Sequence, residues 1–263
     1  MAGNVLELSL DSNFGLIPDK DIFKYYSQDY NNGEKPIDKL VLDKYINYWK
    51  DKNKKDNITG VFVEVGAYNG ITYSNTKTME DHLNWTGVLI EPSPQSFQKL
   101  KTVRPDCRNY QCAISNSEEK TLSFTGDDSA VGGLTGVLET MTQKNGRNWI
   151  EAWSQVGQLS LDKIEVPIRK LSDVLDDANI KYIDFLSIDV EGSELQVLET
   201  MNWDIPVYVI VFEISAWGSK GKEMVENCRK LLTEKGFKIA EKLQLDEIWV
   251  NDDYFRKDLL VQK

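Results

Sequence analysis

The sequence predicts an α/β fold, in which helices cover both faces of a mostly parallel sheet. Apolar, β-prone runs at 61–65, 87–90, 182–188 and 207–212 alternate with helix-compatible stretches. Each of these four runs carries an acid at or near its end, and glycine or proline turns follow the first two. With 263 residues, the chain is long enough to bury one sizeable core.

Composition narrows the class of protein. A net charge of −11 argues against a nucleic-acid partner, because affinity for phosphate backbones depends on clustered Lys and Arg. No run approaches the roughly 18 apolar residues of a membrane span, and residues 1–10 do not resemble a signal peptide. The sequence therefore predicts a cytoplasmic protein; it does not predict an oligomeric state. Three cysteines without CxxC spacing indicate neither a disulfide framework nor a zinc site.

We expect two parts along the chain: a lead-in with one helix, residues 1–57, packed on a main domain, residues 58–263. The lead-in helix should begin after Pro36, because apolar residues from Ile37 to Trp49 recur at helical spacing. In the main domain, the pattern predicts further strands at 109–114 and 164–168, the second an edge strand broken by Pro167. The pattern also predicts a hairpin at 122–124 and a closing antiparallel pair at 237–243 and 247–250. Helices are expected around 97–100, after a turn at Pro92 and Pro94, and at 149–156, 171–175 and 221–235. The glycine-rich stretch 126–136 is either an active-site lid or a disordered loop.

The glycine-punctuated stretch 61–72 is the strongest local signal. Gly66 and Gly70 predict a tight turn after a buried strand, and Ser74, Asn75 and Thr76 are suited to cap the next helix. Such a turn presents unpaired N–H groups, so we expect an anionic group on the ligand. The spacing is not the dinucleotide fingerprint, and no phosphate loop occurs, which disfavours a pyrophosphate.

An amino-acid-bearing nucleoside fits this turn better. The N–H groups would bind its carboxylate, and Glu64 would face its ammonium or sulfonium charge; S-adenosylmethionine has these parts. Glu91 lies 21 residues beyond Gly70, near the interval at which an acid on the next strand reaches ribose hydroxyls. Ala113 and Ile114, at the end of the third strand, would then lie beside adenine. The alternative is a plain turn with a solvated Glu64.

Three ordered motifs resemble the FkbM family of S-adenosylmethionine-dependent methyltransferases. They are Phe-Val-Glu-Val-Gly-Ala-Tyr-Asn-Gly at 62–70, Leu-Ile-Glu-Pro-Ser-Pro at 89–94 and Ile-Asp-Val-Glu-Gly-Ser-Glu at 188–194. The resemblance implies the class I methyltransferase (Rossmann-like) fold, with seven strands in the order 3-2-1-4-5-7-6. It also implies O-methylation of a hydroxyl on a sugar, a glycan or a related small molecule. The cofactor-binding residues would be Glu64, Gly66, Ala67, Tyr68, Asn69, Gly70, Ser74, Asn75, Glu91, Pro92, Ala113, Ile114 and Asp189.

The acids at the ends of the fourth and fifth strands are the candidate catalytic groups. The acceptor hydroxyl must lose a proton, and a carboxylate is the available base: Asp189 first, then Glu191 and Glu213. The same acids could instead bind Mg²⁺ or another divalent cation. The family often has a histidine just after the fifth strand, where this chain has Ile214 and Ser215. His82, the sole histidine, is a weaker candidate base.

Other assignments remain open from the sequence alone. The tryptophans Trp149, Trp153 and Trp217 suit either stacking on a sugar or core packing. A nicotinamide-dependent oxidoreductase would share the ribose-binding acid but lacks the phosphate fingerprint. A non-catalytic module that retains the cofactor pocket is the other alternative, and protein methylation is favoured over nucleic-acid methylation by the negative charge.

Overall fold

The computed structural model describes residues 37–49, 59–125, 136–137, 163–214, 218–243 and 246–254. Its helices are α1 (Ile37–Val41), the π-helical segment η1 (Leu42–Ile46), α3 (Lys77–Leu83), α4 (Pro94–Val103), α7 (Leu171–Asp177), α8 (Glu194–Glu199) and α9 (Gly218–Glu234). Its strands are β1 (Val61–Val65), β2 (Thr86–Ile90), β3 (Arg108–Tyr110), β4 (Ala113–Ile114), β5 (Thr121–Thr125), β6 (Gly136–Val137), β7 (Lys163–Arg169), β8 (Ile183–Ile188), β9 (Val207–Glu213), β10 (Lys238–Lys242) and β11 (Asp246–Val250).

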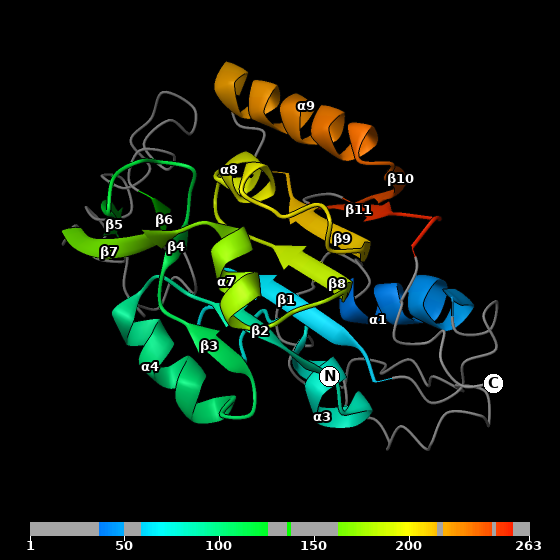
Figure 1. Ribbon diagram of the computed structural model, residues 1–263, viewed down its shortest axis with the longest axis horizontal. Coiled ribbons are helices and arrows are strands. Elements are labelled where there is room, and N and C mark those ends of the chain that lie inside the picture. Colours follow the sequence, from blue (N-terminus) through cyan, green and yellow to red (C-terminus); the bar gives the residue numbers. More distant parts are fainter. Residues whose placement is uncertain are drawn as a thin grey trace, which may run out of the picture.

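The main sheet has the order β10-β11-β9-β8-β1-β2-β3 (Figure 1). The strands from β9 to β3 pair in parallel, whereas β11 runs antiparallel to both β9 and β10. Counted along this sheet, the order is 3-2-1-4-5-7-6. The predicted class I methyltransferase fold, with its terminal antiparallel pair, is therefore confirmed.

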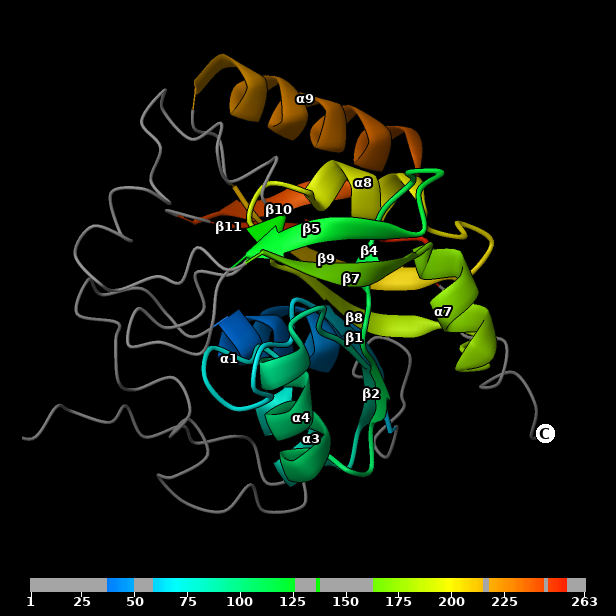
Figure 2. The ribbon, with the colours of Figure 1, turned by 90° about the vertical axis from the view of Figure 1, so that its left-hand side faces the viewer.

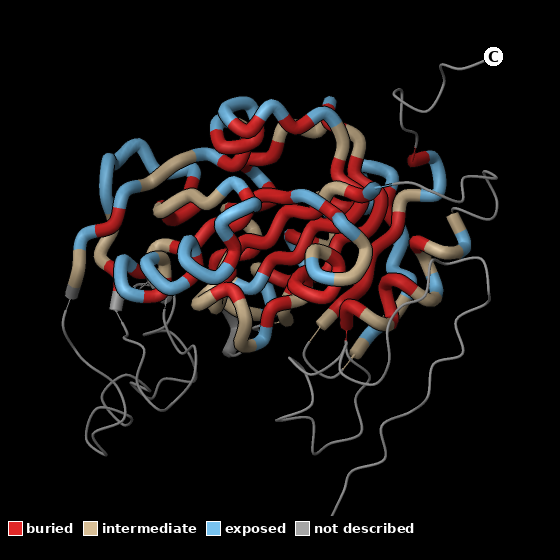
Figure 3. Tube along the Cα trace, turned by 90° about the horizontal axis from the view of Figure 1, so that it is seen from below, coloured by how far each residue is buried: buried red, intermediate tan, exposed pale blue. Residues whose placement is uncertain are grey.

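Two apolar clusters sandwich the sheet, because successive strand residues face opposite sides. In β1, Val63 and Val65 face the cluster formed with α7, α8 and α9, while Phe62 faces the cluster formed with α1, η1, α3 and α4. Figure 2 shows these two helical layers, and Figure 3 shows that the buried chain concentrates in the central strands. Glu64, between Val63 and Val65, shares the side of Phe62.

The segment formed by α1 and η1 packs directly on the main sheet. Its buried side chains, Ile37, Leu40, Val41, Leu42 and Ile46, belong to one cluster with Phe62, Phe185, Tyr208 and Ile248. The expected amphipathic helix is thus present. The division of the chain at 57/58 stays a prediction, since residues 1–36 and 50–58 lie outside the described ranges.

A second sheet, with the order β4-β7-β5-β6, departs from the predicted arrangement. The single strand predicted at 109–114 is two strands: β3 ends at Tyr110 in the main sheet, and β4 pairs with β7 in the second. β7 lies between β4 and β5, so its predicted place at an edge is wrong. Pro167 is tolerated because the β4 pairing begins one residue later, at Ile168. The expected lid at 126–136 and the helix near Trp149 fall almost wholly outside the described residues.

Candidate functional site

A pocket opens at the carboxyl ends of β1, β2 and β8, where the predicted site residues gather. Its wall includes these predicted residues: Gly66, Ala67, Tyr68, Ser74, Glu91, Pro92, Ala113, Ile114, Asp189 and Glu191. Five predicted residues are absent from the wall: Glu64, Asn69, Gly70, Asn75 and Glu213. The parallel sheet explains the convergence, because the ends of its strands share one edge.

Most N–H groups of the glycine turn already have partners, contrary to expectation. Gly66 N and Ala67 N both donate to the Ile90 carbonyl at 3.0 Å. Tyr68 N donates to Glu91 Oε2 at 2.8 Å, and Ile71 N and Thr72 N donate to Asn69 Oδ1. The prediction of a row of free donors was wrong at these positions, because α3 begins only at Lys77 and the intervening chain bonds to itself.

Gly66 brings the turn against the strand on the other side. Its φ is +90°, and a Cβ on it would lie 1.8 Å from the Asp189 carbonyl oxygen. Asp189 N in turn donates to the Val65 carbonyl at 3.0 Å. Glycine is therefore required here both for its backbone conformation and for the contact that joins the β1 and β8 turns.

Glu64 supports the turn from behind rather than lining the pocket. Its carboxylate accepts hydrogen bonds from Ser74 Oγ at 2.9 Å, Asn75 N at 2.7 Å and Thr76 Oγ1 at 2.7 Å, and Arg104 Nη1 lies 3.4 Å away. Strand alternation explains this placement, because Glu64 points to the same side as Phe62. Ser74 Oγ also accepts from Thr76 N and Lys77 N, so the expected helix cap comes from Ser74.

Glu91 forms a fixed acidic wall of the pocket. Only 2% of the residue is exposed, and its oxygens accept from Tyr68 N at 2.8 Å and from Ser93 N at 2.7 Å. Charge-assisted bonds of this kind hold the carboxylate in one orientation. Its place after β2 is the one that the sequence predicted for a ribose-binding acid.

The pocket wall also has an apolar part, which comes from β4 and the second sheet. Ala113, Ile114 and Phe124 are buried and line the pocket together with Cys112. Burial raises the pKa of the Cys112 thiol to about 12, so this side chain is not a thiolate nucleophile near neutral pH. The sequence did not predict Phe124 here, because the second sheet that carries it was not foreseen.

Thr72, Tyr73 and Ser193 line the pocket but were not among the predicted site residues. Tyr73 is 48% exposed and has a positive φ of 59°, as does Tyr68 with a φ of 46°. The available signal for Tyr73 was an aromatic residue just after the glycine-bounded turn, three positions beyond Gly70. His82, by contrast, lies on α3 and not in the pocket wall.

Three acids meet at the ends of β8 and β9. One carboxylate oxygen each from Asp189, Glu191 and Glu213 lies within 4.8 Å of the others. The pKa of Asp189 is well above that of an ordinary aspartate, because the surrounding protein desolvates its carboxylate and because Glu213 and Glu191 repel its charge. Asp189 is exposed and lines the pocket wall.

Glu194 lies beside this group and is fully buried. Burial raises the pKa of its carboxyl to about 7, although the Gly192 N–H, 3.0 Å from Oε1, lowers it. The turn from Asp189 to Glu194 thus holds one acid, Glu194, whose protonation changes near neutral pH.

The family model for the methyltransferase FkbM domain matches residues 64–239, more than half of the chain. The chain belongs to the FkbM methyltransferase family. The predicted membership is confirmed, and the matched segment contains every residue of the pocket described above.

Two curated relatives both have methyltransferase names. Methyltransferase sdnD of Sordaria araneosa is 32% identical over 178 residues, covering 58% of this chain and 64% of the relative. Methyltransferase 1 of Beauveria bassiana is 27% identical over 167 residues, covering 59% and 64%. The chain therefore spans less than two thirds of the length of these relatives.

Similar solved structures include methyltransferase FkbM from Methylobacillus flagellatus KT, with a TM-score of 0.41, 14% identity and coverage of 73% of this chain and 43% of that one. A putative caffeoyl-CoA O-methyltransferase from Staphylococcus aureus gives a TM-score of 0.43, 10% identity and coverage of 83% and 84%. No helix in the described part of this chain has the length and apolarity to cross a membrane.

Proposed function

We propose that this methyltransferase transfers a methyl group from S-adenosylmethionine to a hydroxyl of a sugar, a glycan or a related small molecule. The observation that carries the proposal is that one pocket is lined by Glu91, an apolar surface and the carboxylates of Asp189 and Glu191. These parts match a ribose, an adenine and a cationic methyl-bearing tail beside a group that can take a proton.

The residues present fit this cofactor. Glu91 lines the pocket with a carboxylate, and because each carboxylate oxygen can accept more than one hydrogen bond, ribose hydroxyls could bind to it there. Ala113, Ile114 and Phe124 offer an apolar surface to adenine, and Gly66 and Tyr68 line the wall beside Asp189. Glu64, Asn69, Gly70 and Asn75 would act indirectly, by shaping the turn. When bound, S-adenosylmethionine supplies a methyl group activated by a sulfonium.

The chain's own part in the reaction is to place the acceptor and remove its proton. Asp189 is the first candidate base, because its carboxylate lines the pocket wall where the acceptor would lie. Glu191 and Glu213 are the next candidates. Holding the acceptor hydroxyl in line with the methyl group would account for much of the rate of methyl transfer.

The test is incubation of the purified chain with labelled S-adenosylmethionine and a panel of glycosides and polyhydroxylated small molecules. We expect S-adenosylhomocysteine and a methylated acceptor to form together. Calorimetry showing no cofactor binding, together with no transfer to any acceptor, would refute the proposal. If the wild type is active, a D189A/E191A variant that still binds cofactor but transfers nothing argues against a non-catalytic module.

We also propose that the enzyme acts in the cytoplasm, which is supported by three buried cysteines that form no disulfide. Fractionation of cells that express a tagged chain tests this assignment. Recovery of the tagged chain outside the cell would contradict it.

A further inference from the structure

The spacing of Asp189, Glu191 and Glu213 suits a single divalent cation. Their nearest oxygens lie within 4.8 Å of one another. Oxygen ligands bind Mg²⁺ at about 2.0–2.1 Å and Ca²⁺ at about 2.3–2.6 Å, so donors on opposite sides of one ion are about 4–5 Å apart. Three carboxylates at this spacing repel one another, and a cation between them would remove that repulsion.

Two buried polar atoms in the same turn give a second, independent indication of a ligand. Ser193 is 3% exposed and lines the pocket with Asp189 and Glu191, and its hydroxyl has no hydrogen-bond partner among the described residues. Glu194 is fully buried, and its Oε2 likewise has no partner within those residues. Buried polar groups normally have partners, and a hydrated cation bound in this turn would supply them for both atoms.

We propose that Asp189, Glu191 and Glu213 bind a divalent cation, which also binds the acceptor through a hydroxyl or a pair of vicinal hydroxyls. The cation site stands on the carboxylate geometry, whereas the acceptor contact rests on the proposed function. Each carboxylate contributes one oxygen, which leaves the second oxygen of Asp189 to accept a proton.

The site would assist the reaction as follows. A hydroxyl bound to the cation would lose its proton more readily, and the second oxygen of Asp189 would accept that proton. The electron pair of the acceptor's hydroxyl oxygen would form the new bond to the methyl carbon as the carbon–sulfur bond breaks. The sulfur keeps that bonding pair and becomes a neutral thioether.

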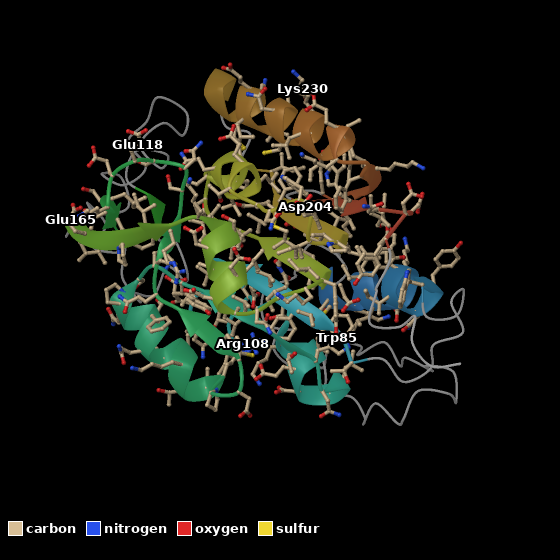
Figure 4. All side chains as sticks on the ribbon, in the orientation of Figure 1. Trp85, Arg108, Glu118, Glu165, Asp204 and Lys230 are labelled. Atoms are coloured by element: carbon tan, nitrogen blue, oxygen red, sulfur yellow. The ribbon has the colours of Figure 1, made fainter. Side chains whose placement is uncertain are left out.

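The experiment is a titration of the full chain, freed of metal with a chelator, with Mn²⁺ alone. Water-proton relaxation and calorimetry measure the binding without any turnover. We expect one Mn²⁺ site, competed by Mg²⁺, whose affinity falls at least tenfold in E213Q and in D189N. The control is E118Q, because Glu118 is an exposed acid in the turn before β5, away from the pocket wall (Figure 4).

Absence of a Mn²⁺ site in the wild type, or unchanged affinity in folded E213Q and D189N, would overturn the cation site. S-adenosylmethionine binding is measured on the same samples. The control E118Q should keep wild-type affinity for both Mn²⁺ and S-adenosylmethionine, since Glu118 does not line the pocket. Failure of the wild type to bind S-adenosylmethionine would count against the proposed function, whereas the Mn²⁺ result decides the cation site by itself.

Discussion

Arg104, at the end of α4, is the residue on which the support of the glycine turn depends. Its side chain is fully buried, with its guanidinium 5.2 Å from the Phe62 ring centroid. Nη1 donates to Ser74 Oγ and Thr76 Oγ1 at 3.0 Å each, and Nε donates to Glu80. Together with Glu64, these contacts form a buried charged network behind the pocket.

Replacing Arg104 by Met should therefore destabilise the chain strongly. The change leaves the carboxylates of Glu64 and Glu80 without their cation, and breaking a buried pair in this way costs about 3–5 kcal/mol. Urea unfolding measures the free energy difference. The matched control is R108M, because Arg108 is exposed at the start of β3 (Figure 4) and should change stability by about 0.5 kcal/mol or less. Equal stability of the two variants would contradict the network's importance.

Asp38 is a second residue whose burial has a measurable consequence. It is fully buried in α1, and burial raises the pKa of its carboxyl to about 7, although the nearby Thr78 hydroxyl lowers it. An unfolded aspartate titrates near 3.9. The folded state thus binds the proton more tightly than the unfolded state, so this residue's contribution to stability falls as pH rises from about 4 to about 7.

The variant D38N should remove this pH dependence. Relative to wild type, its free energy of unfolding should improve between pH 4 and pH 8, by up to a few kcal/mol at about 1.4 kcal/mol per pKa unit. Denaturant unfolding of both proteins at several pH values gives the difference, in which the other titrating groups cancel. Parallel pH profiles for the two proteins would show that Asp38 is not the group responsible.

At the scale of the elements, two turns distinguish two reasons for a glycine: a positive φ and a lack of room for a Cβ. Gly66, after β1, and Gly236, after α9, have nearly equal φ values of +90° and +86°. A Cβ on Gly66 would overlap the Asp189 carbonyl, whereas one on Gly236 would meet nothing within 4 Å. An alanine at each position therefore carries the same backbone strain, but a steric clash at Gly66 alone.

We expect G236A to lose about 1–2 kcal/mol, the usual cost of a left-handed non-glycine residue. The G66A variant should lose more than that and also bind S-adenosylmethionine more weakly, because the β1 and β8 turns must separate. Chemical denaturation and cofactor calorimetry on both variants make the comparison. If G66A binds cofactor as tightly as G236A does, the contact between the two turns does not shape the pocket.

The sequence predicted elements better than it predicted which way their side chains point. The apolar runs of β1, β2, β8 and β9 located the strands, because a parallel strand that is buried on both faces has a nearly continuous apolar sequence. Because apolar and polar residues do not alternate in such strands, the sequence did not show to which face of the sheet the Glu64 side chain points. A shift of one residue would place it on the other face. The split of 109–114 into β3 and β4 was also concealed, since pairing with β7 involves residues more than 50 positions away. Phe124 reached the pocket through that same unforeseen pairing.

At the scale of the whole molecule, the site forms where the carboxyl edge of the main sheet meets the second sheet. The main sheet supplies Gly66, Glu91 and Asp189, and the second sheet supplies Phe124. Ser115, just after β4, joins the parts: its N–H donates to the Arg169 carbonyl and its Oγ to Gln196 of α8. The order of the main sheet followed from the family resemblance, whereas the second sheet had no counterpart in the motifs.

The α1–η1 segment covers part of one face of the main sheet with five buried aliphatic side chains. Full burial of an aliphatic side chain contributes about 1.5–3 kcal/mol, so the five buried in this segment contribute roughly 8–15 kcal/mol as an upper bound. Whole domains are stable by only about 5–15 kcal/mol. A chain that begins at residue 50 should therefore show no cooperative unfolding transition by circular dichroism.

The graded variant L40A, which removes one of these side chains, should keep the transition but lose about 2–5 kcal/mol of unfolding free energy. A truncated chain that unfolds like the full one would instead make the segment an appendage, and would place the start of the folding unit near the predicted boundary at residue 58.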